Sequence, residues 1–489
     1  MPSEREQLNL VLIPLLSPGH IIPMIDMAKV LAGHGVTATI ITTVKNAGRF
    51  NAGIDRVAAS GLPIRLLQVP FPCEEVGLPR GCESLDNLPS YDLVRNFFKA
   101  IDMLQQPVEK MIEELIKPSP CCIICDKYVA WTAQTARRFR IPWISFDGMS
   151  CFTQLCIHNL QMTRIYEGIS EGQPFVVPNM PDKIEFTRAQ LPGAFNPGSS
   201  VADLKGIRER VEAAQVEAYG MVVNSFEEME QRYVHEFRKV KGGKVWCIGP
   251  LSMSNKENLY KIQRGSEAGS FDEDLCLKWL DSRQPGSVIY ACLGSLGRLA
   301  LQQFTELALG LEESNHPFIL VVKEEKKEET ERWIAEDGFE ERTKGRGLLI
   351  RGWAPQVLIL SHPAIGGFLT HCGWNSTLEA VSAGVPMITW PLFSEQFFNE
   401  RLVVQILDIG ASVGAKAVRH LGEEEKSGVS VRRHEIHKAI SKVMDGGMDG
   451  KERRKRAKQV GEMAKMAVEK GGSSDLNIEL LIQDIMQLA

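Results

Sequence analysis

The feature that most constrains the fold is an apolar run near the N-terminus, followed by a turn and a helical pattern. Residues 8–16 are apolar with one exception, which predicts a strand covered on both faces. Residues 17–20 (Ser-Pro-Gly-His) predict a loop, and Pro23 suits the first turn of a helix. Residues 36–43 are rich in β-branched side chains and predict a second strand. A strand, a helix and a strand in this order predict a parallel sheet.

The same alternation recurs in the second half of the chain. Strands are predicted at 287–293, 317–322, 364–370 and 385–390, and helices at 301–313, 375–383 and 395–406. The sequence therefore predicts an α/β protein with two halves. Residues 246–270 lie in a stretch rich in Gly, Ser, Asn and charged residues, which is typical of an interdomain linker.

Composition excludes several classes of protein. The 489 residues carry a net charge of −5, which does not fit a strongly basic nucleic-acid binder. No apolar run reaches the ~18 residues of a membrane span, and the polar first residues do not fit a secretory signal. The 11 cysteines, an odd number, indicate reduced thiols and a cytoplasmic protein.

A turn between a predicted strand and helix carries residues that suit an anion site. Gly373 permits a tight turn after His371, and Asn375 and Ser376 are good residues for a helix N-terminus. A helix N-terminus after a parallel strand offers free N–H groups and the positive end of the helix dipole, so a phosphate is expected there. A capped helix without a ligand is the alternative.

Other polar and aromatic residues stand at similar places. Trp353 follows a predicted strand and can stack on a base, with hydrogen bonds from the backbone of Ala354. The Glu379 carboxylate can accept hydrogen bonds from both hydroxyls of a ribose, and Glu395 with Gln396 can bind sugar hydroxyls. Each has a plainer interpretation: a packed Trp, a surface Glu and the start of a helix.

His20 is a candidate general base. It lies in the predicted loop after the first strand, at the edge where α/β sheets bind ligands. Asp126, directly after the buried run 121–125, is the candidate that orients it. An ordinary loop histidine is the alternative. The loop lacks the Gly-x-Gly-x-x-Gly of a dinucleotide site, and the acidic residues 272–274 are better explained as helix-start residues than as metal ligands.

Residues 353–396 resemble the signature box of the plant family 1 UDP-sugar-dependent glycosyltransferases. The resemblance is carried by Trp353-Ala354-Pro355-Gln356, His362-Pro363, Gly366-Gly367-Phe368, residues 371–379, Gly384-Val385-Pro386 and Glu395-Gln396. It extends over essentially the whole chain. Residues 88–90 (Leu-Pro-Ser) and 103–107 (Met-Leu-Gln-Gln-Pro) resemble the branch acting on triterpenoids, steroids and flavonoids.

The resemblance implies a GT-B fold, in which two Rossmann-like domains with parallel sheets face each other across a cleft. Residues 1–245 would bind the acceptor and 271–472 the UDP-sugar, with 246–270 as linker and a helix at 473–489 crossing back to the N-terminal domain.

The resemblance also implies roles for individual residues toward UDP-glucose. Trp353 stacks on uracil and the Ala354 backbone reads its edge, Gln356 and Glu379 hold the ribose, and the diphosphate contacts His371, Asn375, Ser376 and Ser295. Trp374, Glu395 and Gln396 contact the sugar, and Gly19 and Gly373 belong to the donor-binding set. Gln396 as the last residue of the box implies glucose. No metal is expected.

The implied reaction is an inverting displacement in which His20, oriented by Asp126, removes the proton of an acceptor hydroxyl (or carboxyl) and a β-glucoside forms. The acceptor would be a triterpenoid or steroid, or alternatively a flavonoid or another phenolic. A sugar-nucleotide epimerase and a non-catalytic UDP-sugar sensor are alternatives of other classes. The protein would be a monomer whose only partners are the UDP-sugar and a small apolar acceptor.

The N-terminal half would line the acceptor pocket. Candidate lining residues are Leu16, Met149, Phe152, Phe195 and Leu204. Residues 173–200, with five prolines, predict a loop above this pocket. Lys127 and Tyr128 depart from the small or apolar residues that often follow the family's Asp, which indicates a reshaped acceptor pocket.

Overall fold

The structure is a computed structural model that describes residues 8–115, 120–196, 204–254, 273–323, 327–420, 422–423, 425 and 428–488. It divides into two compact units that are discontinuous in sequence: unit 1 is Met1–Cys151, Ser200–Lys256 and Met466–Ala489, and unit 2 is Phe152–Ser199 and Glu257–Lys465. The domain ranges expected from the sequence remain a proposal. Residues 255–270 of the expected linker lie outside the described residues.

Unit 1 contains a 7-stranded parallel sheet with the strand order β3-β2-β1-β4-β5-β8-β9. Its strands are β1 (Asn9–Ile13), β2 (Thr37–Thr43), β3 (Ile64–Val69), β4 (Cys122–Asp126), β5 (Trp143–Asp147), β8 (Gly220–Val223) and β9 (Val245–Cys247). Every residue of β1, β4 and β5 is buried, as the continuous apolar runs predict for central parallel strands.

The helices of unit 1 follow the strands in the expected alternation. They are α1 (Pro18–Gly33), α2 (Val44–Ala59), α3 (Val94–Met103), α4 (Gln105–Leu115), α5 (Trp131–Phe139), α7 (Lys205–Glu217), α8 (Glu227–Val240) and α19 (Ser473–Leu488). Short 3-10 helices lie at Glu74–Val76, Leu85–Asn87, Tyr91–Leu93 and Leu251–Ser254.

The start of α1 corrects the sequence prediction. The expected loop at 17–20 is wrong, because the helix begins at Pro18 and places Gly19 and His20 in its first turn. Both Pro18 and Pro23 suit a helix start, but Pro18 takes the first position, where the missing N–H costs nothing. Pro23 then lies inside the helix.

Unit 2 contains a 6-stranded parallel sheet with the order β12-β11-β10-β13-β14-β15. Its strands are β10 (Val288–Cys292), β11 (Phe318–Val322), β12 (Gly347–Arg351), β13 (Ile365–Thr370), β14 (Met387–Thr389) and β15 (Gly410–Ser412). Its helices are α10 (Glu273–Asp281), α11 (Leu301–Glu313), α12 (Lys327–Asp337), α13 (Phe339–Arg342), α14 (Gln356–Leu360), α15 (Trp374–Ser382), α16 (Gln396–Arg401), α17 (Arg433–Met444) and α18 (Met448–Val468). The helix predicted at 395–406 is α16 followed by a π-helix at Leu402–Ile406.

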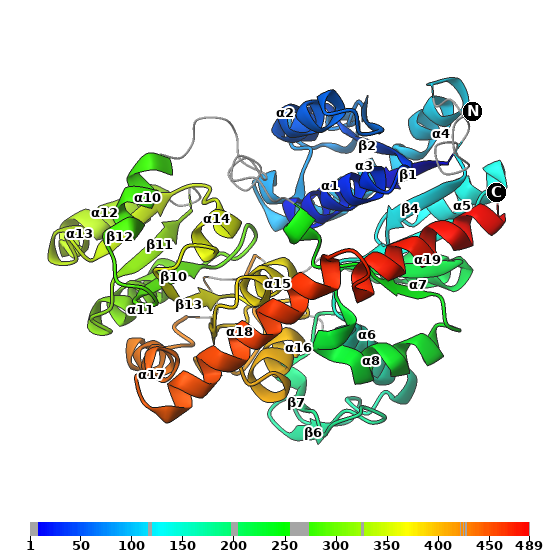
Figure 1. The fold of residues 1–489 in the computed structure, drawn as a ribbon. Helices are drawn as coiled ribbons and strands as arrows, with labels where there is room; N and C mark the ends of the chain where they lie inside the picture. The colour runs from blue at the N-terminus through cyan, green and yellow to red at the C-terminus, as the bar shows by residue number, and fades with distance from the viewer. Residues whose placement is uncertain are drawn as a thin grey trace. The chain divides into compact units, whose positions relative to one another are not determined.

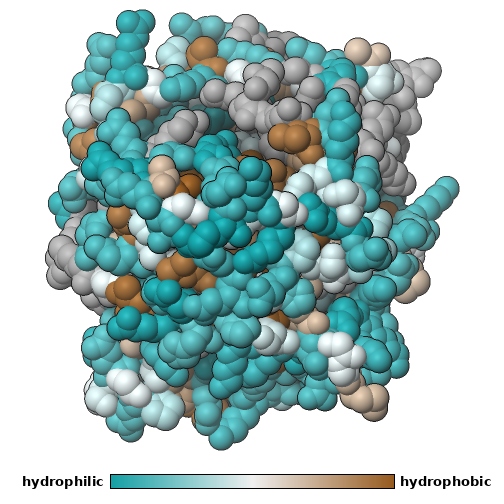
Figure 2. Space-filling view, turned by 90° about the vertical axis from the view of Figure 1, so that its left-hand side faces the viewer, coloured by the Kyte–Doolittle hydropathy of each residue, from teal (hydrophilic) through white to brown (hydrophobic). Residues whose placement is uncertain are grey.

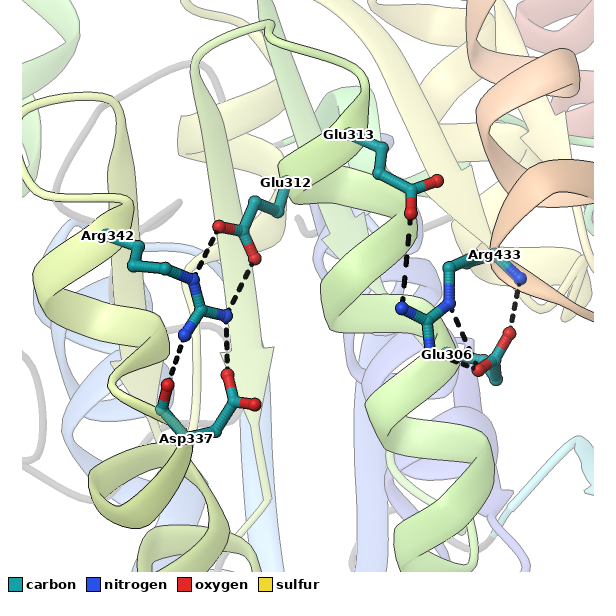
Figure 3. Close-up of polar contacts among 6 residues, drawn as sticks. All are labelled: Glu306, Glu312, Glu313, Asp337, Arg342 and Arg433. Carbon is teal, nitrogen blue, oxygen red and sulfur yellow. Dashed lines mark hydrogen bonds and ion pairs between the residues drawn. The ribbon is translucent and has the colours of Figure 1, made fainter.

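Two arginines tie α11 to its neighbours (Figure 3). Arg433, the first residue of α17, donates to Glu306 from its backbone N–H at 2.6 Å and from Nη2 at 2.8 Å. Arg342 of α13 donates from Nε to Glu312 at 2.8 Å and forms an ion pair with Asp337 at 2.5 Å. These contacts hold α17 and α13 against α11.

Residues 152–199 correct a second prediction. The expected loop at 173–200 contains an antiparallel pair, β6 (Pro174–Val176) and β7 (Glu185–Thr187), and a 3-10 helix at Arg188–Gln190. This part follows α6 (Cys151–Thr163), and Phe186 of β7 is 1% exposed. Arg401 of α16 donates to the Glu185 carbonyl at 3.2 Å. The segment therefore packs within unit 2, and residues 197–200 lie outside the described residues.

Helix α19 packs within unit 1, at the red end of the ribbon in Figure 1, on β9 and α8. Lys244 Nζ lies 2.8 Å from Asp484 Oδ1, and His34 Nε2 lies 3.0 Å from Asp475 Oδ1. Asn477 Nδ2 donates to Glu227 at 2.8 Å. Residues from the end of the sequence thus complete a unit that begins with β1.

None of the helices in the described part of the chain is both long enough and apolar enough to cross a membrane. The face of the molecule in Figure 2 is mainly hydrophilic, with apolar side chains in small separate patches.

Candidate active site

His20 and Asp126 meet in unit 1 at a point where the strand order reverses. The chain passes through β2 and β3 between them, but β4 pairs directly with β1. His20 lies in the first turn of α1 and Asp126 is the last residue of β4. The distance from His20 Nδ1 to Asp126 Oδ2 is 2.6 Å, and the Tyr128 N–H donates to Asp126 Oδ1 at 3.0 Å. Open α/β sheets bind ligands at such switch points.

The surroundings of His20 suit a general base. Its side chain is 30% exposed, whereas that of Asp126 is 2% exposed. Burial lowers the pKa of His20, but the charge and hydrogen bond of Asp126 raise it more, so the pKa lies above its usual 6.5. Because the carboxylate holds Nδ1, the other ring nitrogen is the one that can accept a proton from a ligand.

A second charged pair lies beside this one, and sequence reasoning missed it. Lys127 Nζ is 2.6 Å from Asp147 Oδ2, and the side chains are 14% and 2% exposed. Burial lowers the pKa of Lys127, but Asp147, with Tyr128 and Asp126, raises it more. The Tyr128 ring meets the edge of the His20 ring, with centroids 6.0 Å apart. The signal available in the sequence was Asp147 itself, which follows the mainly apolar residues 141–146 just as Asp126 follows residues 121–125.

In unit 2, His371 lies at the corresponding reversal between β10 and β13. A Cβ atom on Gly294, after β10, would lie 2.3 Å from His371 Cε1, and one on Gly373 would lie 2.4 Å from Nε2. The imidazole therefore fits only because both neighbours are glycines. Burial, with a smaller effect of Lys323, lowers the pKa of His371 to about 3. His371 Nδ1 is buried without a hydrogen-bond partner among the described residues.

These features suit the binding of an anion by a neutral ring. A neutral imidazole carries one N–H, which can donate to a phosphate oxygen. Helix α15 begins at Trp374, directly after Gly373, so its first N–H groups point to the same edge of the sheet. Asn375 and Ser376 lie in this first turn. The anion site expected at this turn thus has a structural basis.

Gln356, Ser376 and Glu379 form one cluster in unit 2. Gln356 Nε2 donates to Ser376 Oγ at 3.0 Å and to Glu379 Oε2 at 2.7 Å. Trp353 precedes them, and its Nε1 is buried without a hydrogen-bond partner in the described part of the chain. Ala354 is 9% exposed. The structure thus brings the residues expected around a nucleoside to one end of α14 and α15.

The residues expected to contact the sugar are placed less uniformly. The side-chain oxygen Oε1 of Gln396 accepts hydrogen bonds from the backbone N–H groups of Leu392 and Phe393 at 2.8 and 3.0 Å, so this side chain holds the turn before α16. Its amide nitrogen takes no part in these bonds. Glu395 is half-buried at the N-cap of α16, and Trp374 is 3% exposed.

Ser295 and Gly19 lie at exposed positions. Ser295 follows β10, and its carbonyl accepts from Lys323 Nζ at 2.6 Å. Gly19 is the second residue of α1. The geometry gives neither residue a contact that distinguishes a ligand-binding role from an ordinary loop or helix start.

The five expected acceptor residues are divided between the two units, and their role stays a prediction. Leu16 is 2% exposed, and Met149 Sδ lies 3.7 Å from Lys127 Nζ in unit 1. Leu204 is half-buried at the N-cap of α7. Phe152 is fully buried in α6, and the Phe195 ring packs against Tyr166 with centroids 5.2 Å apart, both in unit 2. Met149 thus contacts one of the charged residues beside His20.

Comparisons with known sequences identify the family of the chain. A family model described as UDP-glucoronosyl and UDP-glucosyl transferase matches residues 275–422, which contain the His371 turn and the Gln356 cluster. The chain is 51% identical over 485 residues to UDP-glycosyltransferase 73C3 of Arabidopsis thaliana, covering 99% of this chain and 97% of that one. It is 50% identical to UDP-glycosyltransferase 73C11 of Barbarea vulgaris, covering 99% and 97%.

Solved structures give the same result. UGT73P12 of Glycyrrhiza uralensis, complexed with glycyrrhetinic acid 3-O-monoglucuronide, matches with a TM-score of 0.89 and 35% identity, covering 98% of this chain and 96% of that one. UGT71G1 of Medicago truncatula, complexed with UDP-glucose, matches with a TM-score of 0.77 and 26% identity, covering 99% and 100%. With its two domains of parallel sheets, the chain has the GT-B fold and belongs to the plant family 1 UDP-glycosyltransferases, enzymes that transfer a sugar from a UDP-sugar to a small molecule.

Proposed function

We propose that the protein transfers glucose from UDP-glucose to a hydroxyl group of a small apolar metabolite, a triterpenoid or a steroid, and that His20 is the general base. The observation that carries the proposal is the 2.6 Å contact between His20 Nδ1 and Asp126 Oδ2. An oriented histidine at a ligand-binding edge is what hydroxyl activation requires, whereas binding a UDP-sugar without turnover does not require it.

In the proposed reaction, His20 Nε2 takes the proton of the acceptor hydroxyl. The acceptor oxygen forms a bond to the anomeric carbon, and the bond from that carbon to the β-phosphate oxygen breaks. UDP leaves with the electron pair, and inversion at the anomeric carbon gives a β-glucoside. Asp126 keeps the imidazole in the correct tautomer and stabilises the imidazolium that forms.

The proposed donor site lies in unit 2. Trp353 stacks on uracil beside the Ala354 backbone, and Gln356 with Glu379 holds the ribose. The phosphates lie at the start of α15 against His371, Asn375 and Ser376, where the N–H groups stabilise the charge of the departing UDP. The buried, unpartnered Nδ1 of His371 supports this arrangement, because in the tautomer that carries the proton on Nδ1 it can donate to a phosphate oxygen.

The remaining donor residues are proposed from the family resemblance. Trp374, Glu395 and Gln396 contact the glucose, and Ser295, Gly19 and Gly373 complete the set. The complex of UGT71G1 with UDP-glucose supports glucose as the sugar.

The acceptor class rests on a relative. UGT73P12 is complexed with a glucuronide of glycyrrhetinic acid, and it is 35% identical to this chain. This supports a polycyclic apolar acceptor. A flavonoid is the second candidate, because the 26% identical UGT89C1 of Arabidopsis thaliana is complexed with quercetin.

We also propose a cytoplasmic location. All 11 cysteines are free thiols, which fits a reducing compartment. Fractionation of cells that express a tagged protein tests it, and recovery from the secretory pathway would contradict it.

Product formation tests the main proposal. The protein is incubated with UDP-glucose, UDP-galactose or UDP-glucuronic acid and a panel of triterpenoids, steroids and flavonoids, and products are analysed by mass and NMR. The expected product is a triterpenoid or steroid β-glucoside. Conversion of UDP-glucose to UDP-galactose without an acceptor would indicate an epimerase, and tight binding of UDP-glucose without any product would indicate a sensor. The His20→Ala variant should bind UDP normally and lose most transfer activity.

A further inference from the structure

We propose that Lys127 and Asp147 are positioning residues of the active site, whose opposite charges hold His20 at the base strength that proton removal from a hydroxyl requires. This inference rests on the proposed role of His20 as the base.

The two residues are brought beside His20 by the register of two strands. β4 and β5 are parallel neighbours, with Asp126 opposite Phe146. Lys127 follows β4, its N–H donates to the Phe146 carbonyl at 3.3 Å, and Asp147 is the last residue of β5. Lys127 and Asp147 therefore lie at the same sheet edge as the contact between His20 and Asp126.

The ammonium group of Lys127 is held on several sides. It lies 2.6 Å from Asp147 Oδ2, 3.7 Å from Met149 Sδ and 5.3 Å from the centroid of the Tyr128 ring. The side chains of Lys127 and Asp147 are 14% and 2% exposed. Water screens such charges poorly, so their effect on a neighbouring imidazole is larger than that of a surface pair.

Three charged side chains act on His20: Asp126 of β4, Lys127 after it, and Asp147 of β5. Asp126 and Asp147 raise the pKa of His20, and Lys127 lowers it. Lys241, at the end of α8, faces Asp147 and Lys127 and adds a further positive charge beside the pair. The carboxylates of Asp126 and Asp147 favour proton transfer to His20, while Lys127 keeps His20 from binding the proton too tightly.

The test compares variants that remove one charge each. Lys127→Met removes the ion-pair partner of Asp147 and should raise the pKa of His20. Asp147→Asn leaves Lys127 uncompensated and should lower it. An opposite charge within ~4–6 Å shifts a pKa by roughly one to three pH units, so we expect shifts of roughly one pH unit in opposite directions. In the double variant the pKa of His20 should be close to that of the wild type. Lys127→Arg, which keeps the charge, should leave the pKa of His20 unchanged.

Two readouts are needed. The first is the acid limb of kcat/KM against pH with UDP-glucose and the best acceptor, which reports the base in the free enzyme. The second is NMR titration of histidine-labelled protein without substrate, with the His20 signal assigned from a His20→Gln variant. The NMR readout tests the charges even if the protein transfers no glucose, so failure of the proposed function is distinguishable from failure of this inference.

Lys110→Met and Glu114→Gln are matched controls, because this ion pair is exposed at 72% and 59% in the same unit. Neither control should move the His20 titration. Opposite shifts in the single variants, cancelled in the double variant, support the proposal. Shifts in the same direction, or no shift in folded variants, overturn it, because a purely structural pair would not change sign with the charge removed. If a single variant does not fold, the double variant and Lys127→Arg still decide: a displaced titration in either one overturns the proposal.

Discussion

The variant Gly373→Ala tests whether the His371 ring keeps its position because the residue beside it has no Cβ atom. The backbone of Gly373 has φ −59° and ψ 142°, which alanine adopts without strain. The new Cβ atom would lie 2.4 Å from His371 Nε2 and 2.9 Å from Cε1. Carbon atoms in contact prefer separations of about 3.5–4.0 Å, so the ring must move by about 1 Å. Gly294 also lies close to the Cε1 and Nε2 atoms of the ring, which limits the space into which the ring can move.

The size of the effect follows from this displacement. A misplacement of about 1 Å can cost roughly 100-fold in rate. Losing one hydrogen bond to a charged phosphate costs about 1.5–3 kcal/mol, which is roughly 10- to 150-fold in affinity. We therefore expect UDP to bind the Gly373→Ala variant roughly 10- to 100-fold more weakly than the wild type.

Isothermal titration with UDP measures the affinity, and circular dichroism checks that the variant melts like the wild type. Gly446→Ala is the control, because a Cβ atom there meets nothing within 4 Å. If folded Gly373→Ala bound UDP within about twofold of the wild type, the assignment of His371 to the phosphate site would be wrong.

Four further predictions follow from the same structure. Asp126→Asn should reduce kcat/KM by roughly 10²–10⁴-fold with UDP affinity unchanged, because the imidazole loses its orienting partner; steady-state kinetics with UDP titration checks this, and an unchanged rate contradicts it. Transfer activity should fall at acid pH with a midpoint above 6.5, because the raised pKa of His20 leaves less neutral base as the pH drops through it; a pH–rate profile with a midpoint below that value refutes the assignment. Gln396→His should shift donor use from UDP-glucose toward UDP-galactose, read from competing donors, and an unchanged ratio counts against its sugar contact. Glu306→Gln should lower the free energy of unfolding by about 1 kcal/mol, since Arg433 and the start of α17 lose an ionic partner; urea denaturation that matches the wild type would show that the pair adds nothing.

Much of the fold could be predicted from periodicity alone. The helix predicted at 301–313 is α11, with the same bounds, and the buried runs at 8–16 and 121–125 are central strands. These patterns are local, and each is long enough to favour one type of secondary structure over the other. The start of α1 could not be fixed, because Pro18 and Pro23 are equally good first residues. The hairpin of β6 and β7 was missed because strands of 3 residues are too short to show an alternating pattern.

The site also has a part that local sequence patterns could predict and a part that they could not. Gln356, Ser376 and Glu379 lie close in sequence around one strand and one turn, and the structure brings them together as expected. The pair of Lys127 and Asp147 depends on the register of β4 against β5, which no local pattern specifies. The lining of the acceptor pocket stays a prediction, because a buried apolar residue such as Phe152 suits a core as well as a pocket.

The position of α19 has a consequence for how the chain is made. The strand β1 of unit 1 is synthesised before every strand of unit 2 that the structure describes, but the β9 surface of unit 1 is covered by residues 473–488, where His34 and Lys244 contact Asp475 and Asp484. Unit 1 therefore stays incomplete throughout the synthesis of unit 2. During that interval β9 exposes apolar surface that chaperones recognise. A stop codon that removes residues 473–488 would harm the unit that carries His20 more than the unit in which the preceding residues fold.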